Sequence, residues 1–268
     1  MSAIAAEQAI SGRTQAHDRV PLTRVTQVEL RKMFNTRSGF WLIASIAISA
    51  VLATGGVILW APDDQLTYST FATAIRFPVV IILPLIAILA VTSEWSQRTG
   101  LTTFTLVPHR SLIITAKALS AVLVAIAAMV LTFAVGALGN LLSTAVTGTT
   151  LVWDVTLTQC LYYVLGMILS LLTGFMLGVL IRSSTGAIVA YFVLTFVLPT
   201  IFGLLATSQQ WFYDLRPWID IQFAQSGLFV FEQVLTGEHW ANIAVTGVTW
   251  LLIPLAIGLG FVMRAEVK

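Results

Sequence analysis

The sequence predicts an all-α integral membrane protein with six transmembrane helices and both termini on the cytoplasmic side. Three observations point to this fold class. The 268 residues are 57% hydrophobic and only 10% charged, whereas soluble domains carry about 25% charged residues. Six apolar segments are long enough to cross a hydrocarbon core of about 30 Å. Lys and Arg residues are concentrated in alternate connections between these segments.

The apolar segments give the positions of the spans. A helix rises about 1.5 Å per residue, so a span needs about 20 residues. We therefore predict spans at residues 40–60, 71–93, 116–139, 159–181, 186–206 and 241–263. Residues 118–153 contain no charge but are too long for one span, so Gly136, Gly139 and Asn140 are predicted to lead into a loop.

The charges in the connections orient the spans. All Lys and Arg residues except Arg76 and Arg216 lie in the N-terminal segment, in the C-terminal tail, or beside the connections that follow the second and fourth spans. The opposite connections hold the acidic residues Asp63, Asp64, Asp154, Asp214, Asp220, Glu232 and Glu238. Because cytoplasmic loops carry the excess of Lys and Arg, both termini are predicted to be cytoplasmic.

The chain is predicted to divide into three parts. Residues 1–21 are a flexible cytoplasmic N-terminus, residues 22–38 an amphipathic interfacial helix, and residues 39–268 the six-helix transmembrane domain. Within this domain, a cytoplasmic connection covers about residues 94–110 and a long outer connection about residues 207–240. The outer connection is rich in aromatic residues, which predicts short helices in the outer interface. Two readings stay open for this segment: an ordinary aromatic belt, or a role in gating or release.

The predicted interfacial helix has one apolar face. At about 100° per residue, this face collects Leu22, Val25, Leu30 and Met33. A basic amphipathic helix of this kind lies on the inner leaflet. Glu29 also projects onto the apolar face, where a carboxylate is costly unless it is paired. Two readings stay open: Glu29 meets a cation from the cytoplasmic connections, or the helix rolls and Glu29 reaches water.

The connection between the second and third spans is the most informative segment. Glu94 lies where the second span leaves the membrane, Pro108 would stop a helix, and Arg110 follows at once. The residues between them are rich in Leu, Phe and Thr, which predicts a short helix with an apolar face. Such a face is suited to a partner protein, although a connection that simply lies against the membrane has the same pattern.

The succession Glu94, Arg98-Thr99, Pro108, Arg110 and Lys117 after a second span resembles the permease subunit of type-2 ABC exporters. The resemblance covers about residues 22–263. That family has six spans with both termini inside, an elbow helix before the first span, a coupling segment between spans two and three, and helices in the last outer loop. Arg98 is a departure, since a small residue is common before Thr99 in the family.

The resemblance implies partners and roles. The segment from Glu94 to about Pro108 would dock on an ATP-binding-cassette ATPase subunit, which would bind ATP and Mg and hydrolyse ATP. A second permease subunit, identical or homologous, would complete the path in a bacterial inner membrane. The implied ATPase-coupling residues are Glu94, Arg98, Thr99, Gly100, Leu101, Phe104, Pro108 and Arg110. Lys117 would be an anchor at the membrane surface or a partner for Glu94 or Glu29.

Two features within the spans have open roles. Arg76 is the one charge expected inside a span, where arginine is costly and often functional. It either extends to the outer surface or lines the translocation path. The fourth span carries a small residue at every fourth position, in the order Gly166, Ser170, Gly174 and Gly178. This stripe predicts a close helix–helix contact, within one subunit or between subunits.

Several classes of function are disfavoured. The pattern Gly-x-x-x-x-Gly-Lys-Ser/Thr does not occur, so we expect no ATP site and no enzymatic activity in this chain. The three His residues are far apart and Cys160 is the only Cys, so neither a metal site nor a Cys/His nucleophile pair is expected. We also predict no catalytic residue and no nucleic-acid partner. The apolar spans favour a lipophilic cargo such as a drug, a lipid or a lipid-linked glycan. The alternatives are a secondary carrier driven by an ion gradient and a non-transporting scaffold or immunity protein.

Overall fold

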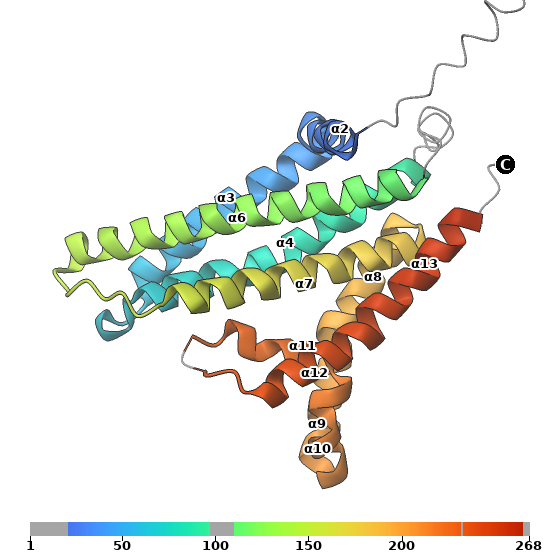
Figure 1. Ribbon diagram of the computed structural model, residues 1–268. Coiled ribbons are helices and arrows are strands. Elements are labelled where there is room, and N and C mark those ends of the chain that lie inside the picture. Colours follow the sequence, from blue (N-terminus) through green and yellow to red (C-terminus); the bar gives the residue numbers. More distant parts are fainter. Residues whose placement is uncertain (1–20, 97–109, 232, 265–268) are drawn as a thin grey trace, which may run out of the picture.

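The computed structural model describes residues 21–96, 110–231 and 233–264, and helices with short connections make up these ranges (Figure 1). No strand occurs within them. Six helical segments are long and apolar enough to cross a membrane: Gly39–Trp60, Tyr68–Ser93, Ser111–Thr147, Leu157–Ile181, Ser184–Ser208 and Gly237–Arg264. The predicted all-helical class and the six segments are thus confirmed. The predicted N-terminal part, residues 1–21, lies outside the described residues except for Pro21.

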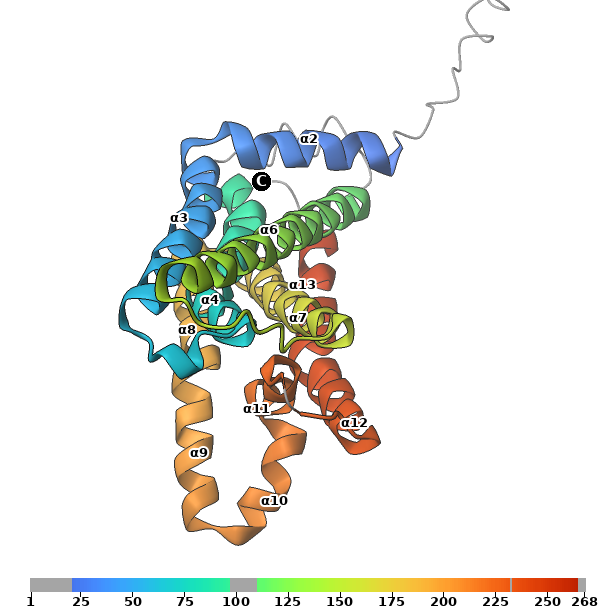
Figure 2. The ribbon, with the colours of Figure 1, turned by 90° about the vertical axis from the view of Figure 1, so that its left-hand side faces the viewer.

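The first four spans pack side by side around α4. They are α3 (Arg37–Trp60), α4 (Tyr68–Ser96), α6 (Arg110–Thr147) and α7 (Leu157–Ile181). α4 contacts each of the other three (Figures 1 and 2), and fully buried side chains such as Leu83 and Leu171 fill the core between them. The helix α2 (Leu22–Asn35) lies across one end of this group (Figure 2), and the short helix η1 (Asp63–Gln65) lies at the other. We refer to these as the α2 end and the η1 end.

The last two spans diverge from this group (Figure 1). The fifth consists of α8 (Ser184–Phe192), η2 (Val193–Val197) and α9 (Leu198–Ser208), and the sixth of α12 (Gly237–Gly247), η4 (Val248–Leu252) and α13 (Ile253–Arg264). η2 and η4 are π-helical, and Pro199 and Pro254 follow them closely. Proline lacks an N–H and its ring displaces the carbonyl four residues earlier, so a widened turn accommodates each proline without ending the span.

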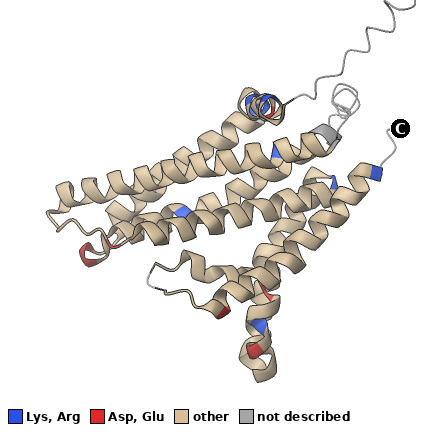
Figure 3. Ribbon diagram, viewed as in Figure 1, with Lys and Arg blue, Asp and Glu red and all other residues tan. Residues whose placement is uncertain are grey.

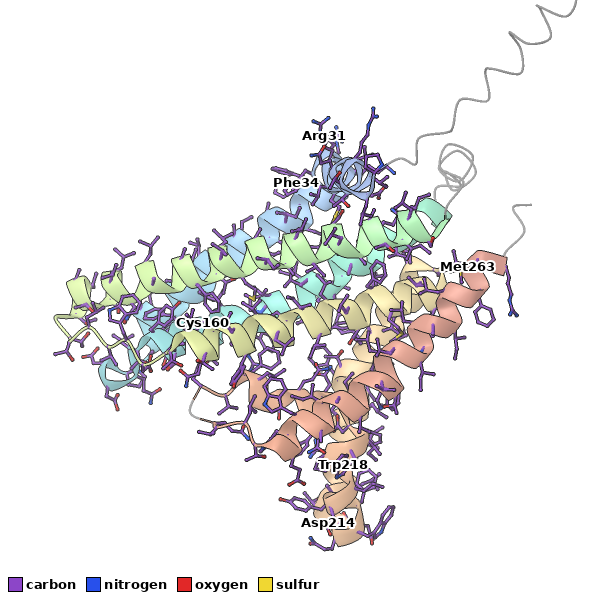
Figure 4. The ribbon with its side chains drawn as sticks, viewed as in Figure 1. Arg31, Phe34, Cys160, Asp214, Trp218 and Met263 are labelled. Atoms are coloured by element: carbon purple, nitrogen blue, oxygen red, sulfur yellow. The ribbon has the colours of Figure 1, made fainter. Side chains whose placement is uncertain are left out.

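Three short helices connect the last two spans: α10 (Gln210–Ile219), α11 (Ile221–Ser226) and η3 (Gly227–Phe229). The sequence predicted short helices in this outer connection, and the structure contains them. Figure 4 places Asp214 and Trp218 on α10, at the extremity of the molecule remote from α2. Asp220 begins α11 as its N-cap, because its carboxylate accepts hydrogen bonds from the N–H groups of Gln222 and Phe223 at 3.0 and 3.1 Å.

A buried tyrosine compensates for one proline in α4. Pro84 cannot donate to the carbonyl of Val80, four residues earlier, and an unsatisfied carbonyl in an apolar span costs several kcal/mol. The Tyr191 hydroxyl, from α8, donates to this carbonyl at 2.8 Å. A second buried tyrosine, Tyr163 of α7, donates to the carbonyl of Ala72 at 2.8 Å. These two hydrogen bonds fix α7 and α8 against α4.

Two residues of the small-residue stripe of α7, Gly174 and Gly178, face α4 of the same chain. A Cβ atom at Gly174 would lie 2.6 Å from the carbonyl oxygen of Pro84, and one at Gly178 would lie 3.3 Å from that of Ile88. Ser170 is buried and its hydroxyl lies 3.3 Å from that of Tyr191. The absence of side chains thus lets the two backbones approach closely, which is how helices gain contact in a lipid solvent.

Gly174→Ala is expected to lower the free energy of unfolding by about 1–3 kcal/mol, because the added methyl group meets backbone that cannot move cheaply. The matched control is Gly260→Ala in α13, where an added Cβ would meet nothing within 4 Å. This control is expected to be neutral or up to about 1 kcal/mol more stable, since Ala favours helix over Gly. Equal effects of the two substitutions on unfolding in mixed micelles would contradict the close α4–α7 contact.

The predicted end of the third span is wrong. Gly136, Gly139 and Asn140 do not lead into a loop, because α6 continues without a break to Thr147. Both glycines face neighbouring helices: a Cβ at Gly139 would lie 2.5 Å from Thr54, and one at Gly136 would lie 3.5 Å from Tyr68. The Asn140 side chain donates to the carbonyl of Val152 at 2.9 Å. The two glycines therefore allow neighbouring helices to pack closely, and Asn140 fixes the α6–α7 connection.

Candidate functional site

The helix α2 packs against α6 through the face that the sequence assigned as apolar. Val25, Thr26 and Glu29 are buried in this contact, while Leu30 is half-buried. Arg31 lies on the opposite, exposed face and points away from the bundle in Figure 4. The apolar face of α2 is therefore largely occupied by other helices of the same chain.

Glu29 lies at the centre of this contact and forms a buried ion pair. Its Oε2 atom is 2.7 Å from Nζ of Lys117 in α6, and each of the two residues is only 5% exposed. The other carboxylate oxygen, Oε1, is 2.6 Å from Nζ of Lys32, whose side chain is about half exposed. Of the two readings of Glu29 that the sequence left open, the structure shows the paired one.

Further hydrogen bonds bring α4 into the same cluster. Nζ of Lys117 donates to the carbonyl of Ala90 in α4 at 3.0 Å. The Ser120 hydroxyl contacts the carbonyl of Thr26 at 3.2 Å, across the α2–α6 boundary. We call Glu29, Lys117, Ser120, Thr26 and the carbonyl of Ala90 the polar junction, since one ammonium group and one hydroxyl join three helices there.

The polar junction holds Glu29 in its charged form. Burial by itself raises the pKa of this carboxyl group, but the positive charges and hydrogen bonds of Lys117 and Lys32 outweigh burial. The net result is a pKa below the ordinary value of the group. A charged pair in these surroundings is costly to break, because one charge would remain buried without its partner.

The polar junction lies at the base of the connection that was predicted to couple to an ATPase. Glu94 is in the last turn of α4 and Arg110 is the first residue of α6, and both helices reach the α2 end there (Figure 1). Lys117 follows Arg110 by seven residues, or about 10 Å along the helix. The other predicted coupling residues lie outside the described residues: Arg98, Thr99, Gly100, Leu101, Phe104 and Pro108.

Arg76 lies deeper in its span than the sequence predicted. α4 begins at Tyr68 rather than at Phe71, so Arg76 is about 12 Å from the start of the helix. Its side chain is half-buried, and its guanidinium carbon lies 4.9 Å from the centre of the Phe229 ring. Gly166 leaves room for this ring, because a Cβ there would lie 2.5 Å from it. Gly166 therefore packs against η3, whereas the rest of its stripe faces α4 and α8.

Sequence reasoning missed the aromatic residues around Arg76. The Tyr163 ring stacks on Phe231 and meets Phe229 edge-on, both with centroids 5.4 Å apart. The high aromatic content of the outer connection was the available signal, but nothing in it identified which rings return to α4 and α7.

The segment between the last two spans also encloses a cavity of about 220 Å³. Polar side chains from α11, α12 and the intervening connection line it, among them Ser226, Gln233, Glu238, His239 and Asn242. The His239 ring bonds to Thr236 and Gln233, and the Oδ1 atom of buried Asn242 has no hydrogen-bond partner. The cavity thus has a mixed lining, because Pro217, Phe223 and Ala224 lie beside these polar side chains.

Comparison with known proteins does not add a family. No protein-family model matches the chain, and no curated protein matches it. A function for this chain is therefore inferred from the polar junction, the surroundings of Arg76 and the layout of the six helices.

Proposed function

We propose that this chain is the membrane-spanning permease subunit of an ATP-driven exporter, coupled to separate ATPase subunits through the connection between α4 and α6. One observation carries the proposal. The polar junction joins α2, α4 and α6 beside the two ends of that connection. A push on the connection would move the two helices it joins, and the buried ion pair would pass this motion to α2.

The orientation follows from the distribution of charge. Figure 3 shows Lys and Arg on α2 and near the α2 ends of α6, α7 and α13, while Asp and Glu gather at the η1 end and on the segment between α9 and α12. Because Lys and Arg favour cytoplasmic loops, we place the α2 end and both termini in the cytoplasm. α2 then lies on the inner leaflet, with its exposed basic face toward anionic headgroups.

Cysteine labelling tests this orientation. Cys160 is the only native cysteine, so Cys160→Ala gives a cysteine-free background. In this background, Thr150→Cys near the η1 end is expected to react with a membrane-impermeant maleimide in intact cells. Ser111→Cys at the α2 end is expected to react only after permeabilisation; both native side chains are exposed. Labelling of Ser111→Cys in intact cells would invert the orientation and remove the docking site from the cytoplasm.

A second permease copy and an apolar cargo complete the proposal. Large apolar side chains are exposed along α3 and α9, including Leu52 at 70% and Leu204 at 65%. Lipid can cover these exposed apolar faces. A second copy that encloses a translocation path would also pack against faces of this kind. We propose a bacterial inner membrane as the location and a lipophilic or amphiphilic molecule as the cargo.

Capture of the partner tests the function. The tagged full-length chain, purified from its own membranes, is expected to bring with it a separate chain that contains a phosphate loop and hydrolyses ATP. ATP hydrolysis by that partner is expected to rise when the permease is added back in proteoliposomes. Purification without such a chain, combined with uptake or efflux driven by an ion gradient, would favour a secondary carrier instead.

A further inference from the structure

Arg76 is an expensive residue at its position. It lies about 12 Å from the start of a span, while half the hydrocarbon thickness is about 15 Å. An arginine at such a depth is costly, and proteins retain one where it faces a counter-ion or a polar path. The charge of Arg76 therefore calls for a neighbouring anion.

The described residues supply no such anion. The guanidinium group packs over Phe229, and its Nε atom is buried without a hydrogen-bond partner. Within the described ranges, no carboxylate forms an ion pair with Arg76. The nearby Tyr163 hydroxyl donates to the carbonyl of Ala72 and is uncharged, so it is not the anion. The aromatic ring offsets part of the charge, but it leaves the N–H donors unused.

Arg216 shows how the same chain completes an arginine site. Its guanidinium carbon lies 4.5 Å from the centre of the Phe223 ring, which matches the contact of Arg76 with Phe229. In addition, its Nε donates to Asp220 at 3.0 Å, and Nη2 lies 3.4 Å from the carbonyl of Pro199. Both sites thus contain the cation and the ring, and among the described residues only the site of Arg216 contains the anion.

We propose that Arg76 binds the oxyanion of an amphiphile, such as a lipid phosphate or carboxylate, between α4, α7 and η3. A planar guanidinium group with free N–H donors recognises such oxyanions in a bidentate manner. The partly exposed ring of Phe229 offers an apolar surface to the attached chain, while the rings of Tyr163 and Phe231 are buried behind it. Arg76 is only half-buried, so its charge is accessible. This site does not depend on ATP-driven export.

Lipid binding to the purified full-length chain tests the site. Native mass spectrometry in a mild detergent would compare dioleoylphosphatidylglycerol with dioleoylglycerol, which has the same chains and no oxyanion. One phosphatidylglycerol is expected to bind at least about tenfold more tightly than dioleoylglycerol, since charge-assisted hydrogen bonds have this magnitude. Arg76→Gln is expected to remove this preference, and Arg76→Lys, which keeps a point charge, to retain part of it.

Arg216→Gln is the matched control and is expected to leave the preference unchanged. Phe229→Leu keeps Arg76 but removes the ring, so it is expected to weaken binding less than Arg76→Gln does. An Arg76→Gln protein that binds phosphatidylglycerol as the native chain does would overturn the proposal. Tighter phosphatidylglycerol binding by Glu232→Gln would also overturn it. That result would mean that the Glu232 carboxylate occupies the site in the native chain. Displacement by inorganic phosphate at equal concentration would assign the anion to a free phosphate.

Discussion

Lys117→Met is expected to lower the free energy of unfolding by about 3 kcal/mol, because it leaves the Glu29 carboxylate buried without its main partner. This value is at the low end for a broken buried pair, since Lys32 remains 2.6 Å from the same carboxylate. The substitution also removes the hydrogen bond to the carbonyl of Ala90. The measurement is reversible unfolding of the purified chain in mixed micelles.

A double-mutant cycle separates the pair from its surroundings. Glu29→Met alone is expected to cost a similar amount, while the double substitution is expected to cost much less than the sum, because two apolar side chains can replace a buried pair. Lys32→Met is the control: its side chain is 47% exposed, so we expect a loss of about 0–1 kcal/mol. An effect of Lys117→Met no larger than that of Lys32→Met would show that the junction contributes little.

The same pair predicts a dependence on pH. The folded-state pKa of Glu29 is lowered, so the pair contributes fully to stability above the ordinary Glu pKa of about 4.3. This contribution is lost as the pH falls from there through the lower folded-state pKa. The stability difference between the native chain and Glu29→Gln is therefore expected to be constant near neutral pH and to shrink only in acid. A change between pH 6 and 8 would assign the effect to another group.

Leu101→Asp with Phe104→Asp is expected to release the ATPase partner and to abolish ATP-driven export. The resemblance to type-2 ABC exporters places these residues on the docking segment, and an apolar docking face loses its contact when it carries charge. The two residues lie outside the described part of the chain, so the expectation depends on the sequence and on the position of the connection between α4 and α6. Co-purification and ATPase stimulation provide the readouts.

The matched control introduces the same charges at the opposite end. Thr150→Asp with Leu151→Asp changes two exposed residues near the η1 end and is expected to leave partner binding intact. Expression level and the melting temperature of the permease alone distinguish lost docking from misfolding. Normal partner binding by the Leu101→Asp, Phe104→Asp chain would show that the docking segment lies elsewhere, while failure to find any ATPase would refute the proposed function itself.

The positions of the spans were largely predictable because hydropathy is a local property. Residues 40–60 and 159–181 match α3 and α7 to within a few residues, since long apolar runs bounded by polar residues have no other favourable arrangement in a bilayer. The end of the third span was not predictable in this way. Gly136, Gly139 and Asn140 have the composition of a turn, but contacts with α3, α4 and the α6–α7 connection keep them helical.

The sequence by itself determined the six apolar helices, the amphipathic character of residues 22–38 and the costly positions of Glu29 and Arg76, because each depends only on residue type and helical spacing. Only the tertiary structure decided that Lys117 meets Glu29, that Tyr191 satisfies the carbonyl freed by Pro84, and that Phe229 lies beneath Arg76. These partners are far apart along the chain. Their pairing depends on how whole helices pack, and no local pattern contains that information.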